Sequence, residues 1–140
     1  MDHATDRHEL EVLSLEECLT LLGSRPLGRL AYVDRGAPVI VPVNHVVDGR
    51  TVVFRALQGA KTEALLLGRP VAFQVDDHDP ARSVGWSVLV QGTAEPVDDA
   101  ETRRLVAELD SWAAPTAMRS MVVRLRPDEV HGRRLRRPAS

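Results

Sequence analysis

The sequence predicts a mainly β domain in which six or seven mostly antiparallel strands close into a barrel, with short helices covering part of it. Two observations lead to this prediction. Apolar and β-branched runs follow one another with only tight turns between them, as at Arg35-Gly36 and Asp48-Gly49. Two of the runs, Val39-Ile40-Val41 and Val88-Leu89-Val90, are apolar at every position, so both faces of those strands should be buried.

The bulk properties of the chain exclude several classes of protein. Its 140 residues suit one domain, and its net charge of −2 gives no overall field that would attract nucleic acid or an anionic membrane. Cys18 is the single cysteine, which rules out an intrachain disulfide and fits a reducing compartment. No apolar run is long enough for a signal peptide or a membrane span. We therefore expect a cytoplasmic location, with neither nucleic acid nor membrane as a partner.

The chain should begin with a flexible arm over residues 1–11, followed by one domain over residues 12–135. Ser14 and Glu17 have the spacing of a capping box, which predicts a helix of about two turns. Gly23 is placed to end that helix. The domain is therefore expected to start with a helix rather than a strand.

Three strands should follow this helix, over residues 28–34, 37–47 and 50–55. Pro38 and Pro42 cannot donate ladder hydrogen bonds, so the second strand should lie at a sheet edge or carry a bulge. Between the second and third strands, Asp48-Gly49 predicts a type I′ hairpin turn centred on these two residues. Short turns between adjacent strands imply an antiparallel sheet.

The second half of the chain alternates helices and strands. Gly92 stands inside a long expected strand and predicts a β-bulge there. The expected elements are a helix over 61–67 ended by Gly68, strands over 70–76 and 86–97 separated by a polar loop over 77–85, a helix over 98–112, strands over 118–126 and 130–135, and a basic tail over 136–140.

The two fully apolar strands also predict a homodimer. One face of each strand fills the barrel, and the other face needs a cover. Three short helices can cover only part of the outer surface of such a barrel. A second copy of the chain is therefore the expected partner.

One segment combines the features of an anion site. A strand ends in Arg55, a loop containing Gly59 follows, and Lys61, the only lysine of the chain, stands at a helix start. Cations beside a helix N-terminus can hold a phosphate. The alternative is an ordinary solvated strand end and helix start. The histidines lack metal-ligand spacing, so no metal site is expected.

Five stretches, in this order, resemble the small pyridoxamine 5′-phosphate oxidase-like proteins of actinobacteria. The resemblance covers roughly residues 14–135. Its stretches are Gly28-Arg29-Leu30-Ala31-Tyr32-Val33-Asp34, then Pro38-Val39-Ile40-Val41-Pro42-Val43-Asn44, then Val53-Phe54-Arg55 to Gly59-Ala60-Lys61, then Pro70-Val71-Ala72-Phe73-Gln74-Val75-Asp76, and Gly85-Trp86-Ser87-Val88-Leu89-Val90-Gln91-Gly92.

This resemblance implies a split β-barrel homodimer that binds FMN between its two subunits. A barrel this small is filled by its own side chains, so a groove between subunits is the remaining place for a flavin. The residues implied at the cofactor are Pro42, Val43 and Asn44 at the flavin ring, Arg55 and Lys61 at the phosphate, and Trp86, Ser87 and Val88 from the partner chain.

The chain departs from the family pattern at two places. Ala56 stands where many relatives carry a threonine that donates to the phosphate. The C-terminal stretch Val130-His131-Gly132-Arg133-Arg134 lacks the tryptophan and the Arg-His pair that hold pyridoxal phosphate in the true oxidases. We therefore do not expect oxidation of pyridoxamine phosphate.

Three functions remain open on the sequence alone. The first is a flavin-dependent oxidoreductase acting on an unidentified small molecule, with no catalytic acid or base identified. The second is a reductase of the same fold that uses the deazaflavin F420. The third is a non-catalytic protein that binds or stores flavin.

Overall fold

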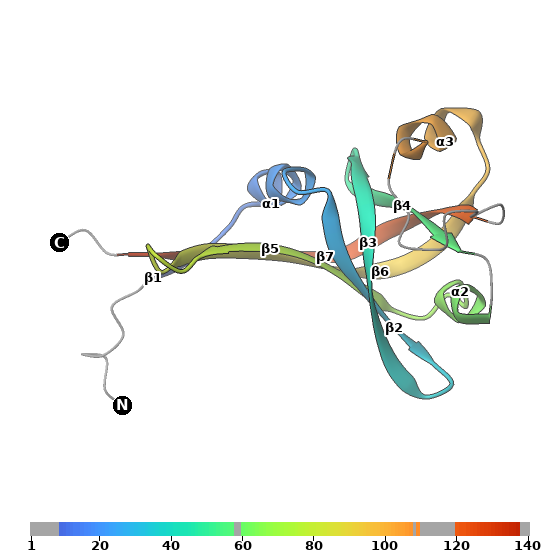
Figure 1. The fold of residues 1–140 in the computed structure, drawn as a ribbon, viewed down its shortest axis with the longest axis horizontal. Helices are drawn as coiled ribbons and strands as arrows, with labels where there is room; N and C mark the ends of the chain where they lie inside the picture. The colour runs from blue at the N-terminus through green and yellow to red at the C-terminus, as the bar shows by residue number, and fades with distance from the viewer. Residues whose placement is uncertain (1–8, 58–59, 108, 110–119, 138–140) are drawn as a thin grey trace.

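A computed structural model describes residues 9–57, 60–107, 109 and 120–137 of the chain. Within these residues seven strands form one sheet, accompanied by three short helices (Figure 1). The elements are β1 (Glu9–Val12), α1 (Leu15–Gly23), β2 (Leu27–Asp34), β3 (Ala37–Asp48), β4 (Thr51–Leu57), α2 (Ala60–Leu65), β5 (Val71–Asp79), β6 (Val84–Val97), α3 (Ala100–Val106) and β7 (Ser120–Arg136).

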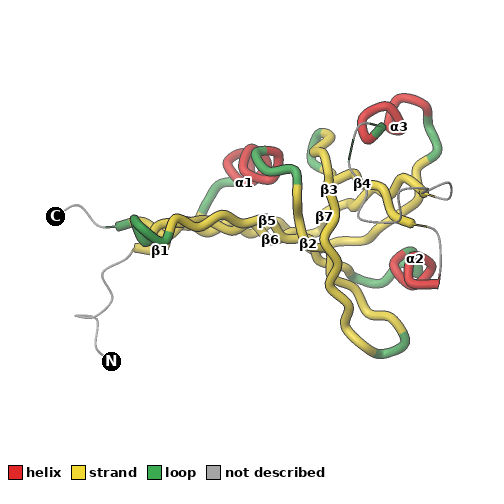
Figure 2. Tube along the Cα trace, in the orientation of Figure 1, coloured by secondary structure: helices red, strands yellow, loops and turns green. Residues whose placement is uncertain are grey.

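The sheet closes into a barrel because β7 pairs on both of its sides. The strand order is β1-β7-β4-β3-β2-β5-β6, and β6 pairs again with β7. Six strands therefore form the closed ring, and β1 is added next to the C-terminal end of β7 (Figure 2). Every pairing is antiparallel. The predicted antiparallel barrel is confirmed.

The predicted helix caps and turns are present, with one correction. Ser14 and Glu17 form the capping box of α1. Arg35 and Gly36 both have positive φ, at 53° and 79°, as a type I′ turn requires. The next turn is centred on Gly49 and Arg50, one residue later than expected, and only Gly49 has positive φ, at 61°. This combination is that of a type II′ turn.

Two segments expected to be irregular are strands. Residues 9–11, expected in a flexible arm, belong to β1 and pair with β7. Most of the polar loop expected over 77–85 is also strand, because β5 and β6 remain paired as far as Asp79 and Val84. Residues 77–85 lack the apolar alternation that marks a half-buried strand. Residues 9–12 do alternate, as Glu-Leu-Glu-Val, but Leu10 and Val12 are 64% and 70% exposed, because this segment lies beyond the barrel.

The strands expected at 118–126 and 130–135 are a single strand, β7. Pro127 lies opposite Gly92 at a register shift in the β6–β7 ladder, so the predicted bulge is confirmed. A proline is tolerated at a bulge, where its missing N–H breaks no ladder bond. The third helix ends at Val106 rather than near residue 112, and residues 110–119 lie outside the described part of the chain.

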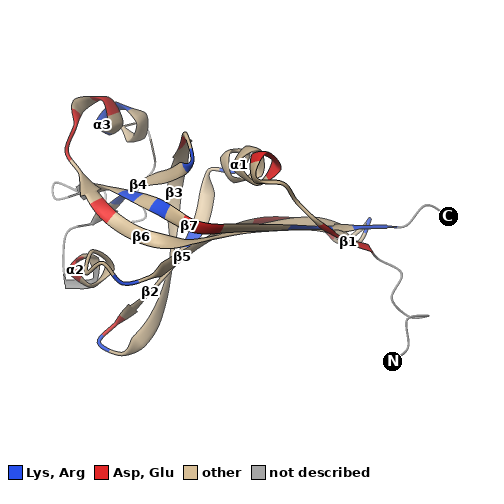
Figure 3. Ribbon diagram, turned by 180° about the vertical axis from the view of Figure 1, so that it is seen from behind, with Lys and Arg blue, Asp and Glu red and all other residues tan. Residues whose placement is uncertain are grey.

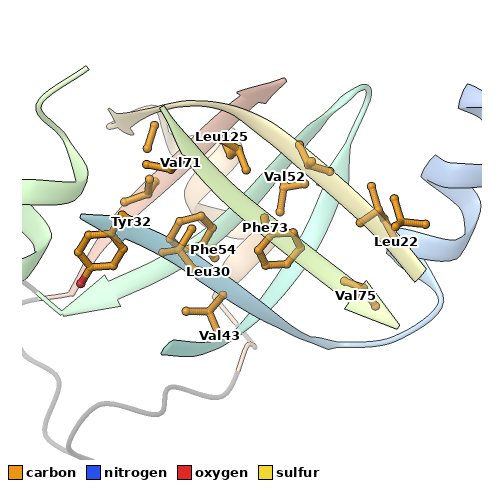
Figure 4. Packing of buried hydrophobic residues seen from close by; sticks show 14 of the residues in the cluster. Leu22, Leu30, Tyr32, Val43, Val52, Phe54, Val71, Phe73, Val75 and Leu125 are labelled. Atoms are coloured by element: carbon orange, nitrogen blue, oxygen red, sulfur yellow. The ribbon is translucent and has the colours of Figure 1, made fainter. Parts of the chain in front are cut away.

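Aliphatic side chains and two phenylalanines fill the barrel (Figure 4). Phe54 and Phe73 are fully buried, and Leu22 of α1 and Leu65 of α2 contribute to the same core. The ring of Phe73 lies against Gly28, where an added Cβ would stand 2.2 Å from the ring. With its interior filled in this way, the barrel has no room for a flavin.

A smaller core lies outside the barrel, beneath α3. It contains Val53, Val106 and Val122, all buried. Next to it, Arg124 donates to Asp48 Oδ2 at 2.9 Å and to Thr102 Oγ1 at 3.0 Å. These contacts hold α3 against β4 and β7, so this part of the outer surface is covered within one chain.

Four strand ends continue past the barrel as a narrow extension, which we call the wing. It consists of residues 9–12, 76–79, 84–87 and 133–136, which are neighbours in the β1, β5, β6 and β7 ladders. The described chain ends lie at its tip, on the left in Figure 1. The wing extends well beyond the barrel core.

Candidate functional site

The candidate site lies where β3 and β4 separate. Their last ladder pair is His45 with Phe54, and from there β3 follows β2 while β4 follows β7. Asn44 and Arg55 are the next residue on each strand. Because Val43, His45 and Phe54 point into the barrel, the alternation of a strand places Asn44 and Arg55 on the outer face. We call this place the fork.

Arg55 is the residue of the fork with the clearest binding potential. Its side chain is half-buried, and its Nε is buried without a hydrogen-bond partner. Buried polar atoms in proteins nearly always have a partner, so an orphaned N–H donor indicates a missing acceptor. A guanidinium can donate two parallel hydrogen bonds to phosphate oxygens. The fork therefore fits an anionic group such as a phosphate.

The second predicted phosphate ligand lies just beyond β4. Lys61 is the second residue of α2, a helix of only six residues. Its side chain, like the whole of Gly59, lies outside the described residues. The backbone thus places Lys61 after the strand that carries Arg55, and its proposed contact with a phosphate stays a prediction.

The residues predicted at the flavin ring differ in orientation. Pro42 is exposed on the outer face, whereas Val43 points into the barrel and is 9% exposed. Asn44 is half-buried and already has an interaction within the chain. The free edge of β3 begins here, since β4 has left it, and the proline at 42 fits the expected edge position. Contact of Val43 with a bound group would be limited to its backbone.

The residues predicted to come from a partner chain lie on or beside the wing. Trp86 borders two hollows of about 550 and 260 Å³, and Ser87 borders the smaller one. Val88 is fully buried in the barrel, so its side chain faces the core. Arginines 82, 134, 136 and 137 border the larger hollow. Trp86 and Ser87 are therefore the accessible members of this group.

The fork and Trp86 of one chain are far apart. Arg55 pairs with Val122 of β7, and Trp86 pairs with Arg134 of the same strand, twelve residues further on. At roughly 3.3 Å per residue, twelve residues of strand extend to about 40 Å. Figure 1 shows β7 crossing the molecule along its long axis. One chain cannot bring both groups to a single flavin mononucleotide.

A polar cluster between these two places was not predicted. Arg29 lies directly opposite Pro42 on β2, and its Nη1 donates to Asp76 Oδ1 at 3.2 Å and to Gln74 Oε1 at 3.3 Å. Asp77, which follows Asp76 on β5, forms an ion pair with Arg25 in the connection from α1 to β2. This contact lowers the pKa of the Asp77 carboxyl. Figure 3 shows the charged residues from the opposite side. Only the strand register reveals this cluster, because its members are distant in sequence.

A buried histidine also adjoins the fork. His45 is 4% exposed, its backbone N–H donates to Pro26 O at 2.9 Å, and its Nε2 lies 2.6 Å from Leu22 O. Its ring stands edge-on to Phe73, with ring centres 4.7 Å apart. Burial lowers the pKa of His45, opposed in part by its hydrogen bonds, so the ring is neutral. The alternation Val43, His45, Val47 could have placed it in the core.

Comparison with known proteins decides the family. The model of the pyridoxamine 5′-phosphate oxidase family matches residues 14–134. The chain belongs to this family. The match spans the closed barrel, the fork and most of the wing, so the observed topology is the split barrel of pyridoxamine 5′-phosphate oxidase-like proteins.

Similar proteins come from several bacteria. The chain is 38% identical to the uncharacterized protein Rv0080 of Mycobacterium tuberculosis, over 91% of this chain and 86% of that protein. The FAD binding protein of Mycobacterium smegmatis is 35% identical, with a TM-score of 0.70 over 91% of this chain and all of that one. An FAD-binding protein of Mesorhizobium loti is 26% identical, with a TM-score of 0.75 over 91% and 98%.

The described residues contain no group of three or more His, Cys, Asp or Glu side chains that could hold a metal ion. In the same part of the chain, no helix is long and apolar enough to cross a membrane.

Proposed function

We propose that the protein is a homodimeric, FMN-binding split barrel that acts as a flavin-dependent oxidoreductase on a small molecule. Family membership supports the flavin, as do the two similar proteins described as FAD binding. The redox chemistry would belong to the flavin, and the protein would bind, orient and tune it.

The observation that carries the proposal is the unpartnered Nε of Arg55 at the fork. A phosphate there would accept the hydrogen bond that the donor lacks, and Lys61 would add a second positive charge. The Asn44 side chain shares the outer face of the fork and would lie toward the ring end of the cofactor. Pro42 and the free edge of β3 would border the ring on the same face.

A second copy of the chain completes this site. Trp86 and Ser87 cannot reach the fork of their own chain, so in the proposed dimer they reach the fork of the partner. The outer face of β2 and β3 offers the contact surface, because Leu27, Val33 and Ile40 are 41%, 43% and 69% exposed there. Exposed large apolar side chains on one sheet face are typical of an interface.

The absorption spectrum of the freshly purified protein tests the cofactor. Under the proposal, the two bands of an oxidised flavin appear, and the released compound is FMN. A single deazaflavin band would instead identify an F420-dependent reductase. A colourless protein that cannot be reconstituted with either compound would contradict the proposal.

The Arg55→Ala variant tests the phosphate contact. Hydrogen bonds to charged groups contribute about 1.5–3 kcal/mol each, so FMN should bind about tenfold to a hundredfold more weakly. Riboflavin, which lacks the phosphate, should lose little affinity. Lys61→Ala should show the same contrast. Equal weakening of both ligands in a titration of flavin fluorescence would mean that neither residue holds the phosphate.

A further inference from the structure

We propose that His45 is a positioning residue of the cofactor site: its imidazole fixes the point where β3 leaves β4, and thereby the placement of Arg55 for a phosphate. The inference rests on the proposed function, because it assumes that Arg55 binds the phosphate of FMN. The proposed binding residues do not explain why the buried side chain of His45 is polar, and this role would.

The contacts of His45 join three segments of the chain at the fork. Leu22 is the last residue but one of α1, and its carbonyl is among those that a helix end leaves without an internal partner. The Nε2–H of His45 donates to this carbonyl at 2.6 Å. Its backbone N–H holds Pro26, in the connection from α1 to β2, at 2.9 Å. One residue therefore ties β3 to both the helix end and the following connection.

The cost of keeping a histidine here points to a task beyond packing. The Nδ1 of His45 is buried without a hydrogen-bond partner. An unpaired buried acceptor is unfavourable, and an aliphatic side chain would avoid it. The neighbouring inward positions on β3 are Val43 and Val47, which contribute to the core in that way. The gain that offsets the unpaired nitrogen is the hydrogen bond to Leu22.

The connection from His45 to Arg55 is short and passes through a buried residue. Phe54 pairs with His45 across the ladder and is fully buried, and Arg55 follows it directly. Nothing within the described residues bonds the Nε of Arg55, so the direction of the guanidinium depends on the backbone of β4 at the fork. Release of the imidazole from Leu22 would let the two strands shift at their last pair and would move Arg55.

The test compares two substitutions in the full chain. His45→Leu removes the donor and puts an apolar side chain of similar size in its place. His45→Gln instead supplies an amide N–H that can reach Leu22 O. Dissociation constants for FMN and for riboflavin are measured by quenching of flavin fluorescence. We expect His45→Leu to weaken FMN about tenfold and riboflavin far less, because only FMN uses Arg55. His45→Gln should restore most of the FMN affinity.

A double-mutant cycle separates positioning from general weakening. If His45 acts through Arg55, His45→Leu should cause no further loss of FMN affinity when Arg55 is already alanine. Val90→Ala, in the barrel core on β6, is the matched control for loss of packing. It should leave the ratio of FMN to riboflavin affinity unchanged. If His45→Leu does not fold, His45→Met, whose flexible side chain adapts to irregular spaces, replaces it.

The possible failures can be told apart. Equal weakening of FMN and riboflavin by His45→Leu, additive losses in the cycle, or a lack of rescue by His45→Gln would show that His45 only fills the core. In that case the phosphate contact of Arg55 stands and this inference falls. If Arg55→Ala leaves FMN affinity unchanged, the phosphate site itself is wrong, and the inference falls with it.

Discussion

Substitution of Ile40 by serine should weaken the proposed homodimer by a predictable amount. Ile40 lies on the outer face of β3 and is 69% exposed in the single chain. Full burial of such a side chain contributes about 1.5–3 kcal/mol, so burial of the exposed part contributes roughly 1–2 kcal/mol. A two-fold interface contains the residue twice. The loss is then about 2–4 kcal/mol per dimer, or roughly a 30- to 700-fold higher dissociation constant.

Sedimentation equilibrium over a range of protein concentrations measures this effect. Leu105→Ser on α3 is the control, because Leu105 is also exposed, at 44%, but lies on the helix that packs over β4 and β7 rather than on the surface around Ile40. The parent and the control should dimerise alike, with FMN present, and Ile40→Ser should shift toward monomer. The reasoning is refuted if Ile40→Ser dimerises as tightly as the parent, or if the parent is a monomer at micromolar concentration.

Three further predictions concern stability. Gly49→Val should lower the free energy of unfolding by about 1–2 kcal/mol or more, because the φ of Gly49 is 61°. An unchanged urea midpoint would argue against the turn. Gly92→Ala should cost about 1–3 kcal/mol or more, since its Cβ would lie 1.9 Å from the carbonyl oxygen of Arg126; a melting temperature equal to that of the parent would contradict this packing. The third concerns pH. Burial lowers the pKa of His45 below the usual 6.5, so the unfolded chain binds a proton at this histidine more readily than the folded chain does. The free energy of unfolding should therefore decrease as the pH falls below about 6.5. His45→Gln should lack this part of the decrease, and identical slopes for parent and variant between pH 7.5 and 5.5 would show that the histidine does not titrate as its burial requires.

Local features were predictable wherever the decisive interactions are local. The capping box at Ser14 depends on two residues three positions apart, and the turn at Arg35-Gly36 on one pair. Strand alternation is likewise a property of short segments, and Gly92 marked the position of the bulge, although the extra residue lies on β7, opposite Gly92. The hairpin at Gly49 shows the limit of such reasoning: the turn type depended on a one-residue choice of register, and the ladder between β3 and β4 decided it.

The candidate site was predictable only in part. Arg55 was named from its place at a strand end before a helix start, and Asn44 from the resemblance; the structure places them next to each other in the ladder at the fork. The resemblance also named Val43 and Val88, whose side chains the strand alternation turns into the core. His45 was missed as a member of the site because, in sequence, it is a single polar residue within an apolar strand. Its hydrogen bond to Leu22 exists only because the folded barrel places α1 beside β3.

The sequence by itself determined that this chain forms an antiparallel barrel with short capped helices, because apolar alternation, turn residues and caps act over a few positions. Only the tertiary structure decided how the barrel closes. The pairing of β6 with β7 joins residues 25 to 50 positions apart, from Val97 with Val122 to Gly85 with Leu135, and the same ladder carries β7 through Pro127 as one strand. It also decided that the fork and Trp86 lie at opposite ends of β7. That separation follows from strand register, which depends on contacts between distant segments and leaves no trace in any one of them.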